Sequence, residues 1–451
     1  MGSIDKKAVD NRVTKSNVSD IVEQQLCNSC GACALVCPVN AISYGETVAG
    51  RVVPRVDEDR CTSCGLCLSV CPGVHFGKSL SERVPSDPFI GTALGCFVGR
   101  AVDEETFLNS QSGGVVSSLL IHALREKLIQ VAVVTVMKPG KPSKPEVVLA
   151  TTEEQILAAQ KSKYSPVPLL SVLRDVEKQG LSVAIVGLPC HLHGLHNLFD
   201  FRFSIKEHVV FTVGLICDRV MTRASVDFLT KRSGKNDEVS FLHFRDKSAG
   251  GYPGSVRVTS SNGDSVVLPA HERMRIKDAF TPARCRLCFD KLNVFADITV
   301  GDPWGITSAD KKNGESVVIY RTPTGGDLVR DAIEHHVVTL RNIDYNEVVK
   351  GQHITQRRLD WRGYCEAWRS LGYKLPDYYA RVAEHTPGTS GRGHYARNLR
   401  RSLSLDWFRS REQLIRHIGR QLLLQEWKRR LLYPVRLARG MLRRIRRWVI
   451  R

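Results

Sequence analysis

Two runs of four cysteines constrain this chain more than any other feature of its sequence. Each run has the spacing C-x2-C-x2-C-x3-C followed by proline, and the second run repeats the first 34 positions later. A repeat of this kind indicates one structural unit used twice. Thiolates are soft ligands, and three of them within seven residues can surround one face of a metal cluster while a fourth comes from elsewhere. The cysteines are Cys27, Cys30, Cys33 and Cys37 in the first run and Cys61, Cys64, Cys67 and Cys71 in the second.

The spacing of both runs is that of bacterial two-cluster ferredoxins, in which the fourth cysteine of each run ligates the other cluster. We therefore predict a ferredoxin domain over residues 23–80 that holds two 4Fe-4S clusters. The crossed ligand sets would be Cys27, Cys30, Cys33 with Cys71, and Cys61, Cys64, Cys67 with Cys37. Structural zinc sites are the alternative, but they pair two C-x2-C hairpins and have no need of a third cysteine in each run. Residues 1–22 are polar and lack periodicity, which predicts a loose arm.

Four more cysteines fall in a region with a different pattern. Between residues 88 and 350 the periodicity predicts a helix over 117–128 and buried strands over 131–137, 183–186 and 209–216, with a hairpin around Asn262-Gly263. This pattern predicts a mixed α/β domain and places the whole chain in the α/β (α+β) class. Cys190 and Cys217 each follow a predicted strand, at the sheet edge where ligands gather. With the Cys285-x-x-Cys288 pair they could hold a third cluster, but cysteines are also common in ordinary cores, and the spacing leaves both interpretations open.

Other residues of the same region indicate a flavin or nucleotide site. Ser112-Gly113-Gly114 precedes the predicted helix, whose N-terminus would suit a pyrophosphate, although such a segment is more often a plain helix cap. Lys163 and Tyr164 could meet phosphates or lie in a solvated loop. Gly301 and Asp302 form a tight turn after a strand. His191 and His193 stand next to Cys190, where histidines more often pack or form hydrogen bonds than bind a metal.

Taken in order, these segments resemble the family of coenzyme F420 hydrogenase/dehydrogenase beta subunits over about residues 90–350. They are Ser112-Gly113-Gly114, Lys163-Tyr164, the turn at 187–190, Cys217, Cys285-x-x-Cys288 and Gly301-Asp302. The resemblance implies one FAD, held near Ser112–Gly114, Lys163, Tyr164, Gly301 and Asp302, and one 4Fe-4S cluster on Cys190, Cys217, Cys285 and Cys288. It also implies an FAD-dependent iron–sulfur oxidoreductase that passes electrons between ferredoxin-type clusters and FAD.

The electrons would go to or come from a two-electron carrier such as coenzyme F420, a small substrate or a redox partner protein. This sequence departs from the family pattern Gly-Thr-Pro-Cys-Gln at the first cysteine, since Leu188 replaces the threonine and His191 replaces the glutamine. We take His191 and His193 as the candidate catalytic acids. The alternative is a non-catalytic electron-transfer subunit that feeds a separate membrane-associated enzyme, for example in cell-surface polysaccharide synthesis.

The C-terminal segment carries most of the net charge of +19, because residues 391–451 contain eighteen Lys or Arg against three acidic residues. After a connector over 351–402, apolar residues recur at helical spacing among arginines from 403 to 451, with a break at Pro434, which predicts basic amphipathic helices. Such helices suit an anionic membrane surface, but they equally suit packing on the chain's own domain or on an acidic partner. No nucleic-acid motif is present. No apolar stretch reaches bilayer length, so we expect a cytoplasmic protein, peripheral on the inner face of the membrane.

Overall fold

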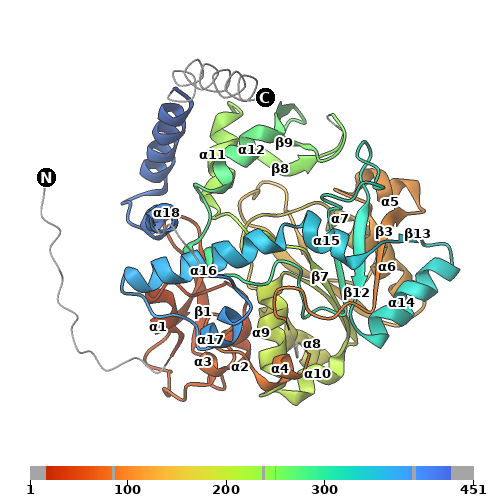
Figure 1. Ribbon diagram of the computed structural model, residues 1–451, viewed down its shortest axis with the longest axis horizontal. Coiled ribbons are helices and arrows are strands. Elements are labelled where there is room, and N and C mark those ends of the chain that lie inside the picture. Colours follow the sequence, from red (N-terminus) through yellow and green to blue (C-terminus); the bar gives the residue numbers. More distant parts are fainter. Residues whose placement is uncertain (1–16, 84–86, 236–238, 249, 389–392, 428–451) are drawn as a thin grey trace, which may run out of the picture.

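The computed structural model describes residues 17–83, 87–235, 239–248, 250–388 and 393–427. Its N-terminal module, drawn red in Figure 1, is a compact pair of cysteine loops joined by a hairpin. Gly31 and Gly65 adopt positive φ angles of 101° and 75° directly before α2 and α3, a conformation that glycine allows at no steric cost. The elements are α1 (Val18–Glu23), α2 (Ala32–Val36), β1 (Ile42–Glu46), β2 (Val52–Val56) and α3 (Leu66–Ser69), with β1 and β2 antiparallel.

An eight-stranded mixed sheet forms the centre of the molecule. Its order is β13-β3-β12-β11-β7-β6-β4-β5, with β4, β6, β7 and β11 parallel to one another. Three strands match the predicted ones, which confirms the α/β class. The strands are β3 (Gly95–Ala101), β4 (Val131–Val136), β5 (Glu146–Ala150), β6 (Val183–Gly187), β7 (Val209–Leu215), β11 (Ile298–Gly301), β12 (Ser316–Tyr320) and β13 (Val338–Asn342).

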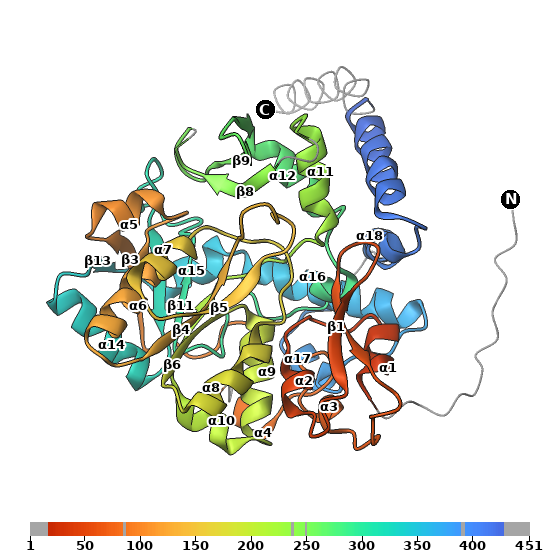
Figure 2. The same cartoon turned by 180° about the vertical axis from the view of Figure 1, so that it is seen from behind.

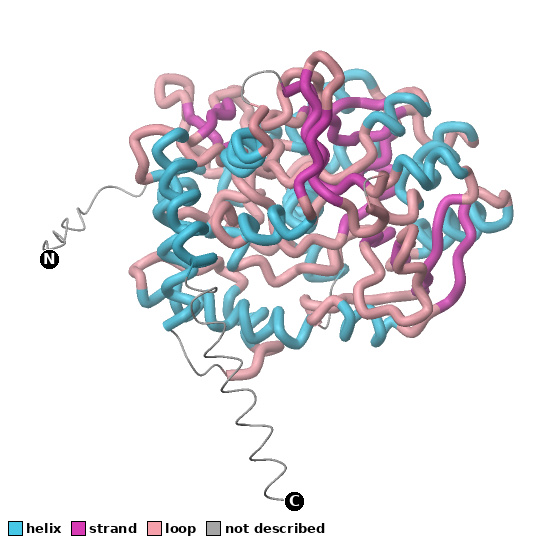
Figure 3. The backbone as a smooth tube through the Cα atoms, turned by 90° about the horizontal axis from the view of Figure 1, so that it is seen from above, coloured by secondary structure: helices cyan, strands magenta, loops and turns pink. Residues whose placement is uncertain are grey.

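Helices cover both faces of this sheet, and Figure 3 shows them on either side of the strands. Alternate residues of β4 enter different cores, because successive side chains of a strand point to opposite faces. Ala132 and Val134 pack with α6 (Val115–Arg125) and α14 (Pro323–Glu334), whereas Val131 and Val133 pack with α8 (Leu173–Gln179) and α9 (Pro189–Phe199). Smaller helices complete the layers: α4 (Lys78–Arg83), α5 (Glu104–Asn109), α7 (Glu153–Ala158), η1 (Leu169–Val172) and α10 (Phe203–His208).

A small second sheet stands beside the large one, drawn green in Figures 1 and 2. The antiparallel strands β8 (Val239–Asp246), β9 (Ser255–Ser260) and β10 (Ser265–Leu268) pack with α11 (Ala224–Arg232) and α12 (Ala270–Lys277). The turn between β9 and β10 contains Asn262 and Gly263. The predicted hairpin is therefore confirmed.

The segment predicted as a connector, 351–402, is instead a layer of helices. α15 (Tyr345–Gly351), α16 (Ile354–Ser370), α17 (Tyr379–Ala383) and α18 (Gly393–Leu403) follow the last strand. Trp361 and Trp368 of α16 are about 1% and 0% exposed and belong to one core with residues of the N-terminal module and of the sheet. In Figure 1, α16 runs across the molecule from the N-terminal module towards α15. Two buried tryptophans explain why this segment folds against both units.

The predictions for the two chain ends also need correction. The loose arm predicted for residues 1–22 extends too far, because α1 begins at Val18; residues 1–16 lie outside the described residues. The first basic helix starts at residue 411 rather than 403, after α18 and the turn η2 (Ser404–Asp406), and is described as far as 427. The predicted helix beyond Pro434 lies outside the described residues. Within the described segments, no helix combines the length and apolar character needed to span a bilayer.

Candidate redox site

The N-terminal module brings its cysteines together in the crossed arrangement. Cys37 of the first run lines one small cavity with Cys61, Cys64 and Cys67 of the second. Conversely, burial raises the pKa of the Cys71 thiol, and Cys30 and Cys27 of the first run lie close enough to raise it further. Each set of four sulfurs is therefore drawn from both runs.

The surroundings of these sulfurs fit an iron–sulfur cluster. Backbone N–H groups of Ser29 and Ala41 donate to the sulfurs of Cys27 (3.4 Å) and Cys37 (3.3 Å). Burial raises the pKa of the Cys30 thiol to about 12, so a free thiol here stays protonated. Iron would displace that proton, because the thiolate is the ligand form. The donor set and the N–H groups aimed at sulfur are those that hold and tune a cluster.

The four later cysteines also converge. Cys190 lies in the first turn of α9 after β6, and Cys217 follows β7, so the neighbouring parallel strands β6 and β7 bring the two together as predicted. Cys285 belongs to α13 (Ala283–Arg286), and Cys288 comes just after it. Burial raises the pKa of Cys190 well above its usual range, and Cys217, Cys288, Cys30 and Cys285 raise it further.

The third cysteine set also lies next to the N-terminal module, because Cys30 of that module is a neighbour of Cys190. Gly194 of α9 lies at the contact: a Cβ atom there would be 3.2 Å from the Cys30 sulfur. The N-terminal module thus docks with its first cysteine run against the helix that carries Cys190.

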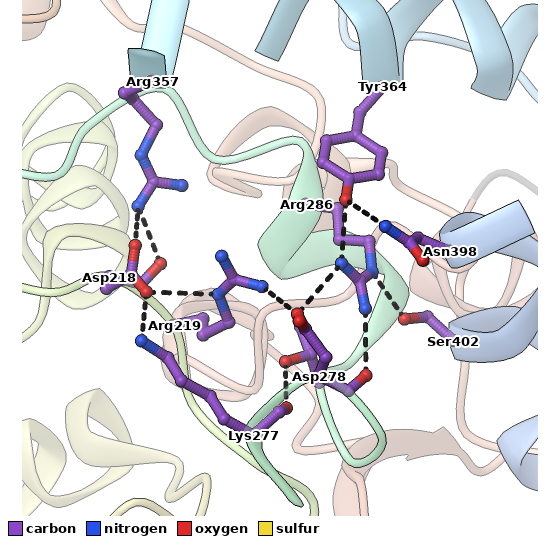
Figure 4. A network of polar contacts seen from close by, with 10 residues as sticks. Asp218, Arg219, Lys277, Asp278, Arg286, Arg357, Tyr364, Asn398 and Ser402 are labelled. Carbon is purple, nitrogen blue, oxygen red and sulfur yellow. Dashed lines mark hydrogen bonds and ion pairs between the residues drawn. The ribbon is translucent and has the colours of Figure 1, made fainter. Parts of the chain in front are cut away.

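The loop of the C-x2-C pair is fixed by an arginine within it. Arg286 donates through Nε to the Ser402 hydroxyl (2.7 Å), through Nη1 to the Tyr364 hydroxyl (2.9 Å) and through Nη2 to the Asp278 carbonyl (3.0 Å). Figure 4 shows these bonds, with Asn398 also reaching Tyr364. Helices α16 and α18, from the predicted connector, therefore position the cysteine pair.

Asp218, directly after Cys217, is held by three cations. Arg357 donates to it at 2.8 Å, Arg219 lies 3.3 Å away, and Lys277 also contacts it (Figure 4). Burial alone would raise the pKa of Asp218, but these cations hold it well below its usual range. The carboxylate is therefore ionised and fixes the turn that carries Cys217.

A cavity of about 980 Å³ opens beside this third cysteine set. It is lined by many of the residues predicted from the sequence, from several strand ends and loops: Ser112, Gly114, Lys163, Tyr164, His191, Cys217, Gly301 and Asp302. Gly113 is not among the lining residues. A Cβ on Gly113 would lie 2.6 Å from the Gly99 carbonyl oxygen, so this glycine allows close packing on β3. Ser112 and Gly114 come directly before α6, and Gly114 is its N-cap.

The cavity wall is predominantly basic. Eight lysines and arginines face three aspartates along it: Lys161, Lys163, Arg219, Arg245, Arg273, Lys277, Lys291 and Arg357 against Asp218, Asp302 and Asp360. Apolar residues such as Leu120, Val134 and Ile156 line the rest. A wall of this composition suits a ligand with an apolar ring system and negative charge.

Family models match most of the described chain. A 4Fe-4S dicluster domain matches residues 26–73, and the N-terminal and C-terminal models of the coenzyme F420 hydrogenase/dehydrogenase beta subunit match residues 96–174 and 180–346. The chain belongs to this family. It is thus an iron–sulfur member of an oxidoreductase family.

This chain is similar to curated proteins over more than half of its length. This family member is 25% identical over 252 residues to coenzyme F420 hydrogenase subunit beta of Methanosarcina barkeri, covering 55% of this chain and 81% of that one. It is 28% identical over 328 residues to one component of the F(420)H(2) dehydrogenase of Methanosarcina mazei, covering 70% and 86%. A chain in the F420-reducing [NiFe] hydrogenase complex of M. barkeri is 21% identical, with a TM-score of 0.48 over 65% of this chain and 99% of that chain.

The side chain of Lys163 in this family member is bonded to backbone carbonyl groups. Its ammonium donates to the carbonyl oxygens of Ala159 and Gln160, the second at 2.8 Å. Burial, and then the neighbouring Lys161, lower the pKa of Lys163 to about 7. Tyr164 stacks edge-on against Phe244 with ring centroids 5.1 Å apart and accepts a hydrogen bond from Arg273 (3.2 Å).

Asp302 has a partner that the sequence did not predict. Arg245 of β8 donates to both Asp302 oxygens, at 2.6 and 3.0 Å, and its side chain is 3% exposed. Arg245 belongs to the small sheet and Asp302 follows β11 of the large sheet, so no local pattern connects them. The pair joins the small sheet to the cavity floor.

The two histidines have different positions. His191 lines the cavity, its Nδ1 accepts a hydrogen bond from the Leu188 N–H (3.2 Å), and burial lowers its pKa to about 4. His193 is not a lining residue. Its Nε2 lies 2.8 Å from the His75 carbonyl oxygen, its ring packs on Phe295, and burial lowers its pKa to about 3. His193 therefore packs at the α9 interface, and the cavity gives no support to its predicted role as an acid.

Proposed function

We propose that this chain is an FAD-dependent iron–sulfur oxidoreductase that passes electrons between three 4Fe-4S clusters and an FAD bound in the cavity. One observation supports this most: Cys217 belongs to the third cysteine set and also lines the cavity, while Cys190 of that set neighbours Cys30. The inner cysteine set thus lies between the cavity and the first cysteine run of the N-terminal module.

The proposed ligands are the three converging cysteine sets. The outer cluster would be held by Cys37, Cys61, Cys64 and Cys67, the middle cluster by Cys27, Cys30, Cys33 and Cys71, and the inner cluster by Cys190, Cys217, Cys285 and Cys288. The protein would limit the access of water to the middle and inner clusters, since three of the eight cysteines are buried and the other five are half-buried. Exclusion of water limits side reactions.

The FAD assignment depends on the cavity. Its volume lies in the range of ligand pockets, and its basic wall complements a pyrophosphate. Ser112 and Gly114 would offer the N-terminus of α6 to the phosphates, and Lys163, Tyr164, Gly301 and Asp302 would orient the rest. A flavin exchanges two electrons with its substrate and single electrons with a cluster, which connects the two kinds of carrier.

Names of the relatives suggest the external partner. Two relatives from Methanosarcina, and a coenzyme F420-dependent sulfite reductase from Methanocaldococcus jannaschii, have names that refer to coenzyme F420. We therefore propose a two-electron carrier of this type or a small anionic substrate. Of the two candidate acids, His191 faces the cavity, but with Nδ1 bonded to Leu188 and its low pKa it would act as a neutral hydrogen-bonding group.

Oxygen-free purification tests the proposal. The chain should contain about twelve irons, which is three clusters of four, and extractable FAD. Cys217→Ala should lose about four irons, and Cys96→Ala, which removes a buried cysteine outside the three sets, should lose none. A colourless protein with zinc, or one with no flavin, contradicts the proposal.

The second candidate is a subunit that relays electrons to a membrane-associated enzyme, and it depends on the basic helix at 411–427. Leu423, Leu424 and Trp427 are 62%, 57% and 61% exposed on this helix. Binding to anionic liposomes that falls as salt rises, together with cluster reduction but no turnover of a small substrate, would favour this candidate.

A further inference from the structure

Arg284 is a buried cation next to the cysteine pair of the inner set. Arg284 lies in α13 and is 4% exposed. Nη2 donates to the carbonyl oxygen of Pro72 (3.1 Å), which follows Cys71, and also to the Tyr378 hydroxyl. Nε and Nη1 have no hydrogen-bond partner among the described residues. A buried guanidinium with unpaired N–H groups is costly unless something negative accepts them.

The charge of Arg284 acts on thiols of two different sets. Arg284 directly precedes Cys285 of the inner set in α13. Its Nη2 donates to the carbonyl oxygen of Pro72, which follows Cys71 of the middle set. It therefore lies within electrostatic reach of both the middle and the inner set.

Tyr378 fixes the guanidinium in this place. Its hydroxyl accepts from Arg284 and donates to the Pro72 carbonyl (3.2 Å). Its ring packs on Phe289 and Phe76, with centroids 5.7 and 5.9 Å away. A side chain held by a second residue in an aromatic cluster keeps its free N–H groups in a constant direction.

Arg286, two residues further on, shows what a purely structural arginine looks like here. All three of its nitrogens donate to oxygen, on Ser402, Tyr364 and Asp278. Arg284 differs because two of its nitrogens have no such acceptor among the described residues. The unpaired donors point to an acceptor that the protein does not itself supply.

We propose that Arg284 is a positioning residue that raises the reduction potentials of both the middle and the inner cluster by placing one positive charge and two N–H donors between them. The proposal rests on the proposed function, because it needs both clusters. Reduction adds one electron to a cluster that four thiolates already make negative, and a nearby cation favours that added charge. N–H donation to cluster sulfur acts in the same direction. The guanidinium also lowers the repulsion between two adjacent reduced clusters.

The test is a redox titration of the reconstituted full chain, followed by electron paramagnetic resonance. Arg284→Gln should lower the midpoint potentials of two clusters, each by at least a tenfold change in the reduction equilibrium constant, which is about 59 mV for one electron. The third, outer cluster should stay unchanged; its signal is identified by its loss in Cys64→Ala. Arg125→Gln removes the same charge from an exposed ion pair with Glu153 and should shift none.

Iron content separates the two proposals. If wild-type chain lacks about twelve irons, the proposed function fails before Arg284 is tested. If it has them and Arg284→Gln leaves all potentials unchanged, or shifts all three equally, the inference about Arg284 is overturned. Should Arg284→Gln fail to assemble, Arg284→Met decides, because it also removes the charge and the N–H donors but leaves an unbranched apolar side chain that adapts to a buried site. Potentials of the middle and inner clusters below wild type support the proposal, and potentials equal to wild type overturn it.

Discussion

Single residues around the cavity show how burial, rather than residue type, sets the chemistry. Lys163 in an exposed loop would be a permanent cation, but here it lies among backbone carbonyls with its pKa lowered to about 7. Near neutral pH it therefore gains or loses a proton easily. An anion bound in the cavity would favour the protonated form and raise this pKa.

This leads to a prediction for the pH dependence of flavin binding by the apoprotein. Protonated Lys163 adds to the positive charge of the cavity wall, which favours the anionic FAD, so FAD affinity should be full below pH 7 and should fall as pH rises through that value. Calorimetry in buffers of different ionisation enthalpy should show proton uptake on binding near pH 8. Lys163→Met should remove both effects. Lys138→Met, at an exposed ion pair with Glu146 outside the cavity, should keep them. Proton uptake that persists in Lys163→Met would assign the effect to another group.

At the scale of elements, the docking of the N-terminal module depends on close backbone contact. The Cys30 carbonyl accepts a hydrogen bond from the Leu170 N–H (2.9 Å), which joins the first cysteine loop to η1. A Cβ on Gly31 would lie 2.8 Å from the Ser171 nitrogen and 2.9 Å from the Pro168 oxygen. The equivalent glycine of the second run, Gly65, has nothing within 4 Å among the described residues.

Gly65 of the second run therefore serves as the matched control for Gly31 of the first run. Gly65→Ala should cost about 1–2 kcal/mol of unfolding free energy, because the new alanine has to adopt a left-handed conformation that is unfavourable for a residue with a Cβ atom. Gly31→Ala should cost clearly more, since the new Cβ also collides with backbone. Denaturant unfolding of both variants measures the difference. Equal losses would mean that the module does not dock through this loop.

The helix at 411–427 can be tested in the same way. Leu414 is 0% exposed and packs in the core of the small sheet with Ile418 and Leu422, whereas Leu424 is 57% exposed. Leu414→Ala should destabilise the protein by about 2–5 kcal/mol through the cavity that it creates, and Leu424→Ala should be nearly neutral. Thermal unfolding without membranes checks this. If Leu414→Ala is neutral as well, the helix does not pack on its own domain.

For the whole molecule, one hydrophobic core connects the cysteine module to the large sheet. Leu26 and Leu35 of the module, Leu192 of α9 and Trp361 of α16 belong to the same cluster of buried residues. Elements that share a core unfold together. The chain should therefore behave as one cooperative unit across this contact.

We predict that cluster bleaching and loss of near-ultraviolet circular dichroism coincide in denaturant under anaerobic conditions. Trp361→Phe should keep the transitions together, since a smaller aromatic ring still occupies much of the site although the hydrogen bond to the Leu287 carbonyl is lost. Trp361→Ala should lower stability by about 3–5 kcal/mol. Bleaching well before the loss of circular dichroism would show that the module unfolds independently.

The sequence by itself determined the features that local spacing encodes. The two cysteine runs, the strand ends at Cys190 and Cys217, the β9–β10 hairpin and a minority of the residues that line the cavity could be predicted, because ligand spacing and hydrophobic period act over short stretches. Only the tertiary structure decided that 351–402 is a helical layer, that His193 packs away from the cavity, and that Arg245 meets Asp302. The same holds for Arg284, which is one more basic residue until folding buries it beside Pro72. These features depend on contacts between residues far apart in the chain, and such contacts follow from how faces pack rather than from any local pattern.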